Sequence, residues 1–372
     1  MKKRKLLIAL LCGALVCLPL AGCNNKNGAS GTDSSVQSEV SEDAGEQNSS
    51  DSSQEYTSDV FAMDTYMTLT AYGENAQEAV EAGIAEIQRL DDLLSTGKDT
   101  SEVAQINANG GGVLSEDTDY LVKRALDIYQ STNGAFDISI YPVMQLWGFT
   151  TGNFVVPSES DLAAKLALVD AGKIILSEEN GQTSISLPEG MEIDLGGIAK
   201  GYTSGRVMDV MKSYGIKSAV INLGGNAHVL GNKTDGSQWK VGIQDPEDEN
   251  GYLGGVSVTD KAIITSGGYE RYFVDKDTGV KYHHIKTGYS ANNGLISVTI
   301  VSADSTLADG LSTSLFVLGT EDAITYCEEH CAEDGFDAIM EDEDGKLYIT
   351  DGIYDDFINM NNNKNIEKIQ TN

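Results

Sequence analysis

The sequence is poor in basic residues: 25 Lys and Arg stand against 57 Asp and Glu in 372 residues, for a formal net charge of −32. Nucleic-acid binding needs a basic footprint, so this imbalance argues against a nucleic-acid partner. It also disfavours direct contact of the folded part with anionic lipid headgroups.

Cysteine is also scarce, with five in the chain. Two lie in the N-terminal apolar segment and a third, Cys23, follows it. Cys327 and Cys331 are one helical turn apart, a spacing that strains a disulfide, and a metal site would need further ligands from elsewhere. We expect these last two to be ordinary helix residues.

The long apolar run lies at the N-terminus, where four basic residues precede Leu6 to Leu20 and Leu-Ala-Gly-Cys23 follows. The run is too short for a comfortable membrane span and has the form of a secretory signal. Its end looks like a bacterial lipobox, although an ordinary signal with a coincidental cysteine remains the alternative. We expect residues 1–22 to be removed and Cys23 to be lipidated, which anchors the exported protein to the outer face of the bacterial cell membrane. Removal takes four bases and no acids, leaving 57 acids against 21 bases, or −36.

Residues 23–56 are Ser, Asn, Gly, Asp and Glu with almost no large apolar side chains. Such a segment cannot bury enough surface to offset its ordering entropy, so it is predicted to be a disordered tether. A folded domain is predicted over residues 57–352 and a flexible, frayed tail over residues 353–372.

The folded part alternates strand-like and helix-like segments. One strand is predicted over Val60–Thr70, and later strands are separated by Gly turns. Helices are predicted over Ala76–Leu94, Thr118–Thr132, the segment after Gly201, and Glu321–Glu333. Many strands with few helices favour an α+β domain of layered antiparallel or mixed sheets with packed helices, rather than alternating βαβ units.

The chain is organised around Asp194-Leu-Gly-Gly-Ile-Ala-Lys-Gly201, which fits neither the dinucleotide fingerprint nor the P-loop spacing. A strand, a Gly pair and an amphipathic helix expose backbone N–H groups at the helix start, where phosphates bind. Asp194 and Lys200 add one carboxylate and one ammonium to this turn. The stretch is a candidate phosphate site, and ordinary turn chemistry is the other interpretation.

A second candidate is Ala308-Asp-Gly-Leu-Ser-Thr313. A helix places Asp309 and Thr313 on one face, where a carboxylate and a hydroxyl can form part of a Mg²⁺ shell. A threonine capped near an aspartate is the alternative.

These stretches, in this order, resemble the motifs of the ApbE family, the flavin transferases that move FMN from FAD onto a protein threonine. The other matching segments are Met63-Asp-Thr65, Gly134-Ala-Phe-Asp137 with Leu146-Trp-Gly-Phe149, Thr265-Ser-Gly-Gly-Tyr269, and His284-Ile285 with Lys286-Thr287-Gly288. The resemblance covers about Val60 to Tyr348. Gly97 stands where the family usually has an aromatic residue, and the Asp-Pro that the family has after the His-Ile pair is missing before Lys286.

The resemblance implies an ApbE-like (T-fold-like) domain that transfers FMN from FAD to a threonine hydroxyl of a target redox protein and releases AMP. It implies Mg²⁺ held by Asp309, Thr313 and the Gly197 carbonyl. His284 is the candidate catalytic base, because imidazole titrates near the working pH. The residues expected along the dinucleotide are Met63, Ala135, Phe136, Asp137, Asp194, Lys200 and Ile285.

Two other functions share these features. Water in place of threonine would make the protein an FAD pyrophosphatase that yields FMN and AMP. A lipoprotein that binds FAD without catalysis is the second alternative. The expected partners are FAD, a threonine-bearing acceptor subunit of a membrane or exported redox protein, and the membrane through the lipid anchor.

Overall fold

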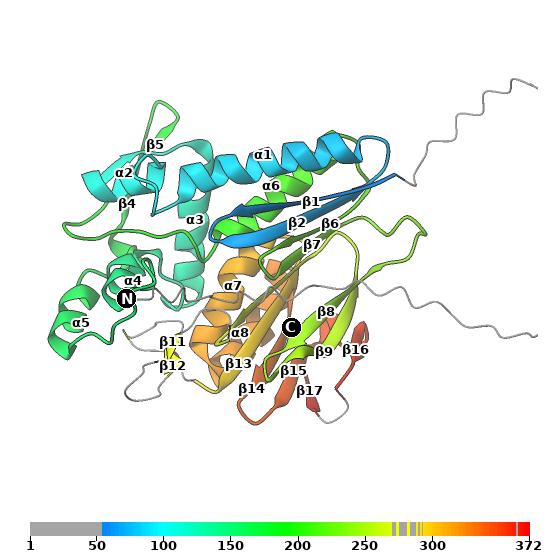
Figure 1. The fold of residues 1–372 in the computed structure, drawn as a ribbon. Helices are drawn as coiled ribbons and strands as arrows, with labels where there is room; N and C mark the ends of the chain where they lie inside the picture. Colours follow the sequence, from blue (N-terminus) through cyan, green and yellow to red (C-terminus); the bar gives the residue numbers. More distant parts are fainter. Residues whose placement is uncertain are drawn as a thin grey trace, which may run out of the picture.

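In the computed structural model, residues 54–269, 273–274, 281–282, 288, 291, 293–361 and 364–372 are described. They form a layered α+β fold, which confirms the predicted fold class (Figure 1). Within this part of the chain no helix has both the length and the apolarity that crossing a bilayer requires.

The central layer is a nine-stranded sheet in the order β1-β2-β6-β7-β10-β13-β14-β15-β17. Neighbouring strands are antiparallel except β15 and β17, which are parallel. The strands are β1 Glu55–Ala62, β2 Thr65–Tyr72, β6 Ser218–Leu223, β7 Asn226–Leu230, β10 Ala262–Gly267, β13 Leu295–Ser302, β14 Phe336–Asp342, β15 Lys346–Thr350 and β17 Asn365–Ile369.

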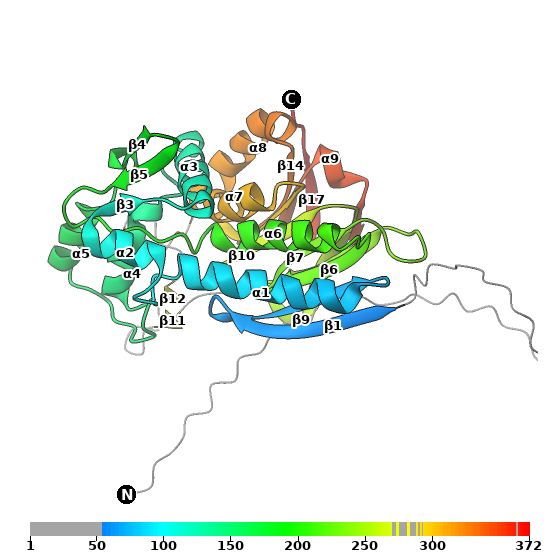
Figure 2. The ribbon, with the colours of Figure 1, turned by 90° about the horizontal axis from the view of Figure 1, so that it is seen from above.

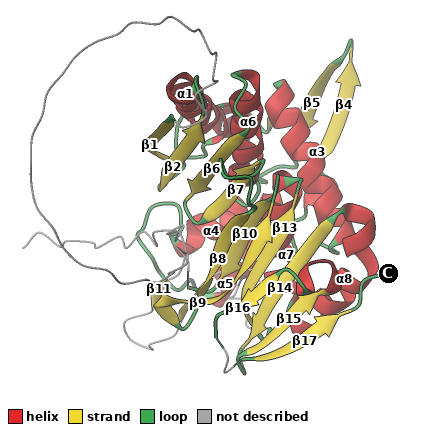
Figure 3. Ribbon diagram, turned by 90° about the vertical axis from the view of Figure 1, so that its right-hand side faces the viewer, coloured by secondary structure: helices red, strands yellow, loops and turns green. Residues whose placement is uncertain are grey.

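Four helices cover one face of this sheet: α1 Ala76–Leu94, α6 Ala199–Ser213, α7 Ser305–Leu318 and α8 Thr320–Asp334 (Figures 2 and 3). α1 packs against α6, and α6 packs against α7. α7 is buried almost all round, as expected for an apolar helix beneath other elements. Cys327 and Cys331 are buried on α8 with free thiols, as ordinary helix residues.

The other face packs on a small sheet of β8 Trp239–Asp245, β9 Asp248–Val258 and β16 Phe357–Asn359. A further lobe lies at the end of the molecule where α3 stands (Figure 1). It contains α2 Glu102–Asn109, α3 Glu116–Ser131, the short helix Ile138–Ile140, α4 Tyr141–Trp147, α5 Glu159–Leu166, the short helix Ala171–Lys173, β3 Gly111–Val113, β4 Ile175–Glu179 and β5 Gln182–Ser186. The remaining elements are β11 Phe273–Val274, β12 Lys281–Tyr282 and α9 Asp351–Tyr354.

The single strand predicted over Val60–Thr70 is wrong. It is a hairpin, in which β1 and β2 are joined at Met63 and Asp64 with φ of 48° and 59°. The β-branched and aromatic composition continues across the turn, so composition alone did not reveal the reversal.

The frayed C-terminal tail is also a wrong expectation. β16 pairs with β9, and β17 completes the edge of the main sheet beside β15. Lys364, just before β17, forms ion pairs with Glu247 and with the buried Glu341. Tertiary pairing therefore orders a segment whose Asn-rich composition indicates disorder.

Candidate functional site

A cavity of about 280 Å³ lies between the loop after α3, the start of α6, the strands β7 and β10, and one side of α7. One part of its wall is apolar, with Phe136, Ile140, Met144, Phe149 and Val169. The other part is polar, with Asp194, Lys200, Asn226, Thr265, Ser266, Asp309 and Thr313. The cavity can therefore hold a ligand that has an apolar ring at one end and a polar or charged group at the other.

The loop Gly134–Asp137 forms the first wall. It leaves α3 through Asn133 and Gly134, both at positive φ, and the Thr132 hydroxyl donates to the Ile128 carbonyl at 2.6 Å. The Asp137 carboxylate accepts from the backbone N–H and the hydroxyl of Ser139, at 2.8 and 2.6 Å. Burial raises the pKa of Asp137, although these hydrogen bonds oppose the shift.

The Gly pair forms the second wall, but the segment before it is not the predicted strand. The Asn107 side chain instead clamps the backbone of Ile193, with both hydrogen bonds at 2.8 Å, and the Asp194 N–H donates to the Ile138 carbonyl. The Asp194 carboxylate accepts from the Gly196 N–H at 2.8 Å and from the Thr96 hydroxyl at 3.3 Å. The first residues of the motif therefore form a rigid turn that lies against the loop of the first wall.

α6 begins at Ala199, directly after this turn. Its first-turn residue Lys200 is half-buried and lines the cavity. Among the described residues, its ammonium has no hydrogen bond or ion pair. A cation and the positive end of a helix dipole therefore face the same space, as the sequence predicted for a phosphate site.

Asp309 and Thr313 lie on α7, and both line the cavity with Gly197. The Asp309 side chain is buried: Oδ2 accepts from the Gly201 N–H at 2.7 Å and Oδ1 from the Asn226 amide at 3.2 Å. The Thr313 hydroxyl lies 3.3 Å from the Ser266 hydroxyl. The predicted i,i+4 placement on one helix face is confirmed.

The donor set fits a hard cation. A carboxylate, a hydroxyl and a backbone carbonyl are all oxygen ligands, and Mg²⁺ characteristically completes such a set with waters and ligand phosphates. No group of three or more His, Cys, Asp and Glu side chains with metal-binding geometry occurs in the described part of the chain. Gly197, Asp309 and Thr313 would therefore hold the ion only in part.

The structure brings most of the predicted site residues together: Ala135, Phe136, Asp137, Asp194, Gly197, Lys200, Asp309 and Thr313 all line the cavity. Met63 is not among the lining residues; it is half-buried, and its N–H donates to Asp91 at 3.1 Å. His284, Ile285 and Cys23 lie outside the described residues. The roles of all these residues stay predictions.

The sequence analysis assigned no role to two other lining residues, Asn226 and Ser266, although Ser266 lies in the Thr265–Tyr269 segment that matches the family. Asn226 begins β7 directly after Gly224 and Gly225, which have φ of 66° and 100°. The double glycine signalled a turn, but only the fold shows that the next side chain reaches α7.

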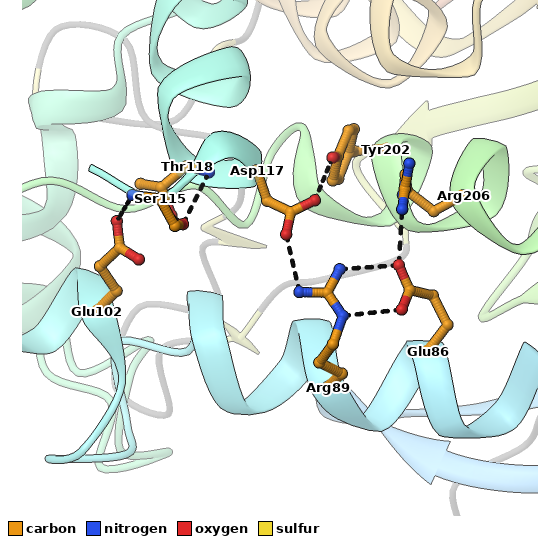
Figure 4. Close-up of polar contacts among 8 residues, drawn as sticks. All are labelled: Glu86, Arg89, Glu102, Ser115, Asp117, Thr118, Tyr202 and Arg206. Atoms are coloured by element: carbon orange, nitrogen blue, oxygen red, sulfur yellow. Dashed lines mark hydrogen bonds and ion pairs between the residues drawn. The ribbon is translucent and has the colours of Figure 1, made fainter. Parts of the chain in front are cut away.

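A network of charged and polar side chains connects the helices α1, α3 and α6 (Figure 4). Arg89 on α1 binds Glu86 and Asp117, and Asp117 on α3 accepts from the Tyr202 hydroxyl of α6. The hydrogen bond from Arg89 lowers the pKa of Glu86, although burial opposes this shift. Burial raises the pKa of Tyr202, and the hydrogen bond to Asp117 raises it further. The network joins α1, the start of α3 and the start of α6, and of these only the start of α6 borders the cavity.

The fold and the cavity define an α+β protein with a site that is apolar at one end and lined by Lys200, Asp309 and Thr313 at the other. The sequence profile of the ApbE family matches residues 63–340, and the chain belongs to this family.

Relatives and solved structures agree with that assignment. The chain is 36% identical over 242 residues to the FAD:protein FMN transferase of Klebsiella pneumoniae, covering 63% of this chain and 74% of the relative. It is 31% identical over 327 residues to that of Treponema pallidum, covering 81% and 88%. The crystal structure of the ApbE protein of Thermotoga maritima superposes with a TM-score of 0.74 at 30% identity, over 80% of this chain and 98% of that one. The flavin transferase ApbE of Vibrio cholerae superposes with 0.68 at 27% identity, over 80% and 97%.

Proposed function

We propose that this protein is an FAD:protein FMN transferase that joins FMN from FAD to a threonine hydroxyl of a redox protein and releases AMP. The observation that carries the proposal is that apolar walls meet Lys200, the start of α6 and the oxygen donors Asp309 and Thr313 in one cavity. A flavin dinucleotide has this distribution, with apolar rings and an anionic pyrophosphate.

In the proposed reaction the threonine oxygen forms a bond to the FMN-side phosphorus, and the bond from that phosphorus to the bridging pyrophosphate oxygen breaks. The threonine proton passes to a base, for which we propose His284, and the charge of the bridging oxygen leaves with AMP. Mg²⁺, when bound, would neutralise pyrophosphate charge. The chain's own part is to position the phosphates at Lys200 and the α6 N-terminus and to bury the rings against Phe136 and its neighbours.

Hydrolysis of FAD is the second candidate, and one observation favours it. Gly97, where the family usually has an aromatic residue, is exposed, and a Cβ there would meet only the Ser95 hydroxyl oxygen, at an ordinary contact distance of 3.7 Å. The adjacent Thr96 contacts Asp194 at the cavity wall. A missing side chain there would leave room for water beside the ligand.

Mass spectrometry distinguishes these functions. The protein is incubated with FAD, Mg²⁺ and a tagged acceptor that carries a candidate threonine. A Mg²⁺-dependent gain on the acceptor of one FMN less water supports the transferase. Free FMN and AMP with an unmodified acceptor support the pyrophosphatase, and intact bound FAD supports a binding lipoprotein and contradicts both reactions.

We also propose that lipidated Cys23 anchors the exported protein to the outer face of the cell membrane. The support is the basic, apolar and Leu-Ala-Gly-Cys pattern of the N-terminus. Cys23→Ser should release the protein from the membrane fraction and abolish labelling with a radioactive fatty acid. Unchanged labelling would contradict the assignment.

A further inference from the structure

Asn226 combines three properties that the proposed reaction does not use. Its side chain is buried, it lines the cavity, and its amide donates to Oδ1 of Asp309 at 3.2 Å. The second carboxylate oxygen accepts from the Gly201 N–H at 2.7 Å. The two donors come from β7 and α6, so they hold the Asp309 carboxylate from two different layers of the fold.

The backbone around Asn226 leaves this amide little freedom. The two residues before it form a tight turn at positive φ, and the Gly225 N–H donates to the Asn222 side chain at 2.8 Å. A Cβ at Gly224 would lie 2.3 Å from the Thr65 hydroxyl oxygen, so the β1–β2 hairpin presses on the same turn. A rigid turn therefore positions the Asn226 side chain next to α7.

Partners that orient a metal-ligating carboxylate commonly change metal affinity 10- to 100-fold when they are removed. We propose that Asn226 is a positioning residue that orients the Asp309 carboxylate toward the cation in the cavity. The inference rests on the proposed function insofar as that function places a divalent cation at Asp309. As a neutral amide, Asn226 donates to the carboxylate without adding a charge that would compete for the ion.

The test measures the binding of Mn²⁺, as a probe for Mg²⁺, to the purified full chain in the presence of FAD at low temperature. The readout is the electron paramagnetic resonance signal of free Mn²⁺. Asn226→Leu keeps the number and branching of the side-chain heavy atoms and removes the donor, so the Kd for Mn²⁺ should rise about 10- to 100-fold. The Kd for FAD measured without metal should stay within about threefold. Asn222→Leu is the matched control, because it disturbs the same turn without touching Asp309.

Two results would overturn the positioning role. One is Mn²⁺ binding by Asn226→Leu equal to that of the wild type. The other is an equal loss in Asn222→Leu, which would make turn shape the cause. A wild-type protein that binds no Mn²⁺ would instead refute the cation in the proposed function, and the inference with it.

Asn226→Ala keeps the test decisive if the leucine variant does not fold, because it removes the donor without adding apolar bulk. The Kd for Mn²⁺ should again rise about 10- to 100-fold. Mn²⁺ binding by this variant equal to that of the wild type would refute the positioning role.

Discussion

Gly201 provides the sharpest test of how the site is held together. It is the third residue of α6, and its N–H, which has no partner within the helix, donates to Asp309. A Cβ at this position would lie 2.1 Å from the Ser305 carbonyl oxygen and 2.6 Å from the Asp309 Cβ. The absence of a side chain therefore lets α6 and α7 approach closely enough for the hydrogen bond.

Gly201→Ala should destabilise the protein. Alanine gains up to about 1 kcal/mol in helix propensity. Overpacking typically costs about 1–3 kcal/mol and occasionally more. The opposing atoms are backbone and Cβ, which no rotamer change can remove, so the cost lies at the upper end of this range. The net loss of unfolding free energy is roughly 2 kcal/mol.

Gly205→Ala is the matched control, one turn later on the same helix. There a Cβ would meet only the Ser305 hydroxyl oxygen, at 3.0 Å. The propensity gain is retained, so we expect a change within about 0.5 kcal/mol of zero or a small stabilisation. Urea unfolding followed by circular dichroism measures both variants. If the two differ by less than about 0.5 kcal/mol, the close approach of α6 and α7 does not constrain residue 201.

Four further predictions follow from residues described above. Burial lowers the pKa of His228 to about 4 in the folded protein, and its Nδ1 lies 3.0 Å from the Ser204 hydroxyl. The pKa of this histidine in the unfolded chain is higher, about 6.5. The His228 contribution to the free energy of unfolding should therefore be complete above about pH 6.5, and the free energy should fall by about 3 kcal/mol as pH drops toward 4. His228→Gln should flatten this part of the pH–stability curve, and an unchanged slope would refute the assignment. Lys364→Met should lower the free energy of unfolding, measured in urea, by roughly 3–5 kcal/mol, because Glu341 is then buried without a partner. The double variant Lys364→Met with Glu341→Leu should recover most of this loss. If the double variant recovers none of it, the lost ion pair is not the cause. Asp309→Ala should leave so little activity that added Mg²⁺ does not stimulate it, whereas stimulation equal to the wild type would remove Asp309 from the cation site. His284→Ala should abolish FMN transfer in the mass assay while FAD binding stays largely intact, and normal transfer would show that the base is another group.

The sequence predicted those parts of the site that local patterns encode. The i,i+4 spacing of Asp309 and Thr313 needs only a helix, and α7 provides it. The turn before α6 was also predicted, because a pair of adjacent glycines typically marks a turn. The hairpin at Met63 was missed because its β-branched and aromatic composition continues across the turn. The pairing of β17 was missed because it depends on a strand distant in the chain. Asn226 was missed for the same reason: its partner Asp309 lies 83 residues away.

The order of the cavity walls along the chain bears on how the protein acquires its ligand. The lining residues begin at Gly134 and end at Val317, so no short piece of the polypeptide contains them all. The main sheet has the first strand at one edge and the last strand at the other, and its closure must wait for the C-terminal residues to be synthesised. A nascent or truncated chain that ends before α7 lacks one whole wall and should not retain the ligand. Ligand loading is therefore a late event, coupled to completion of the fold.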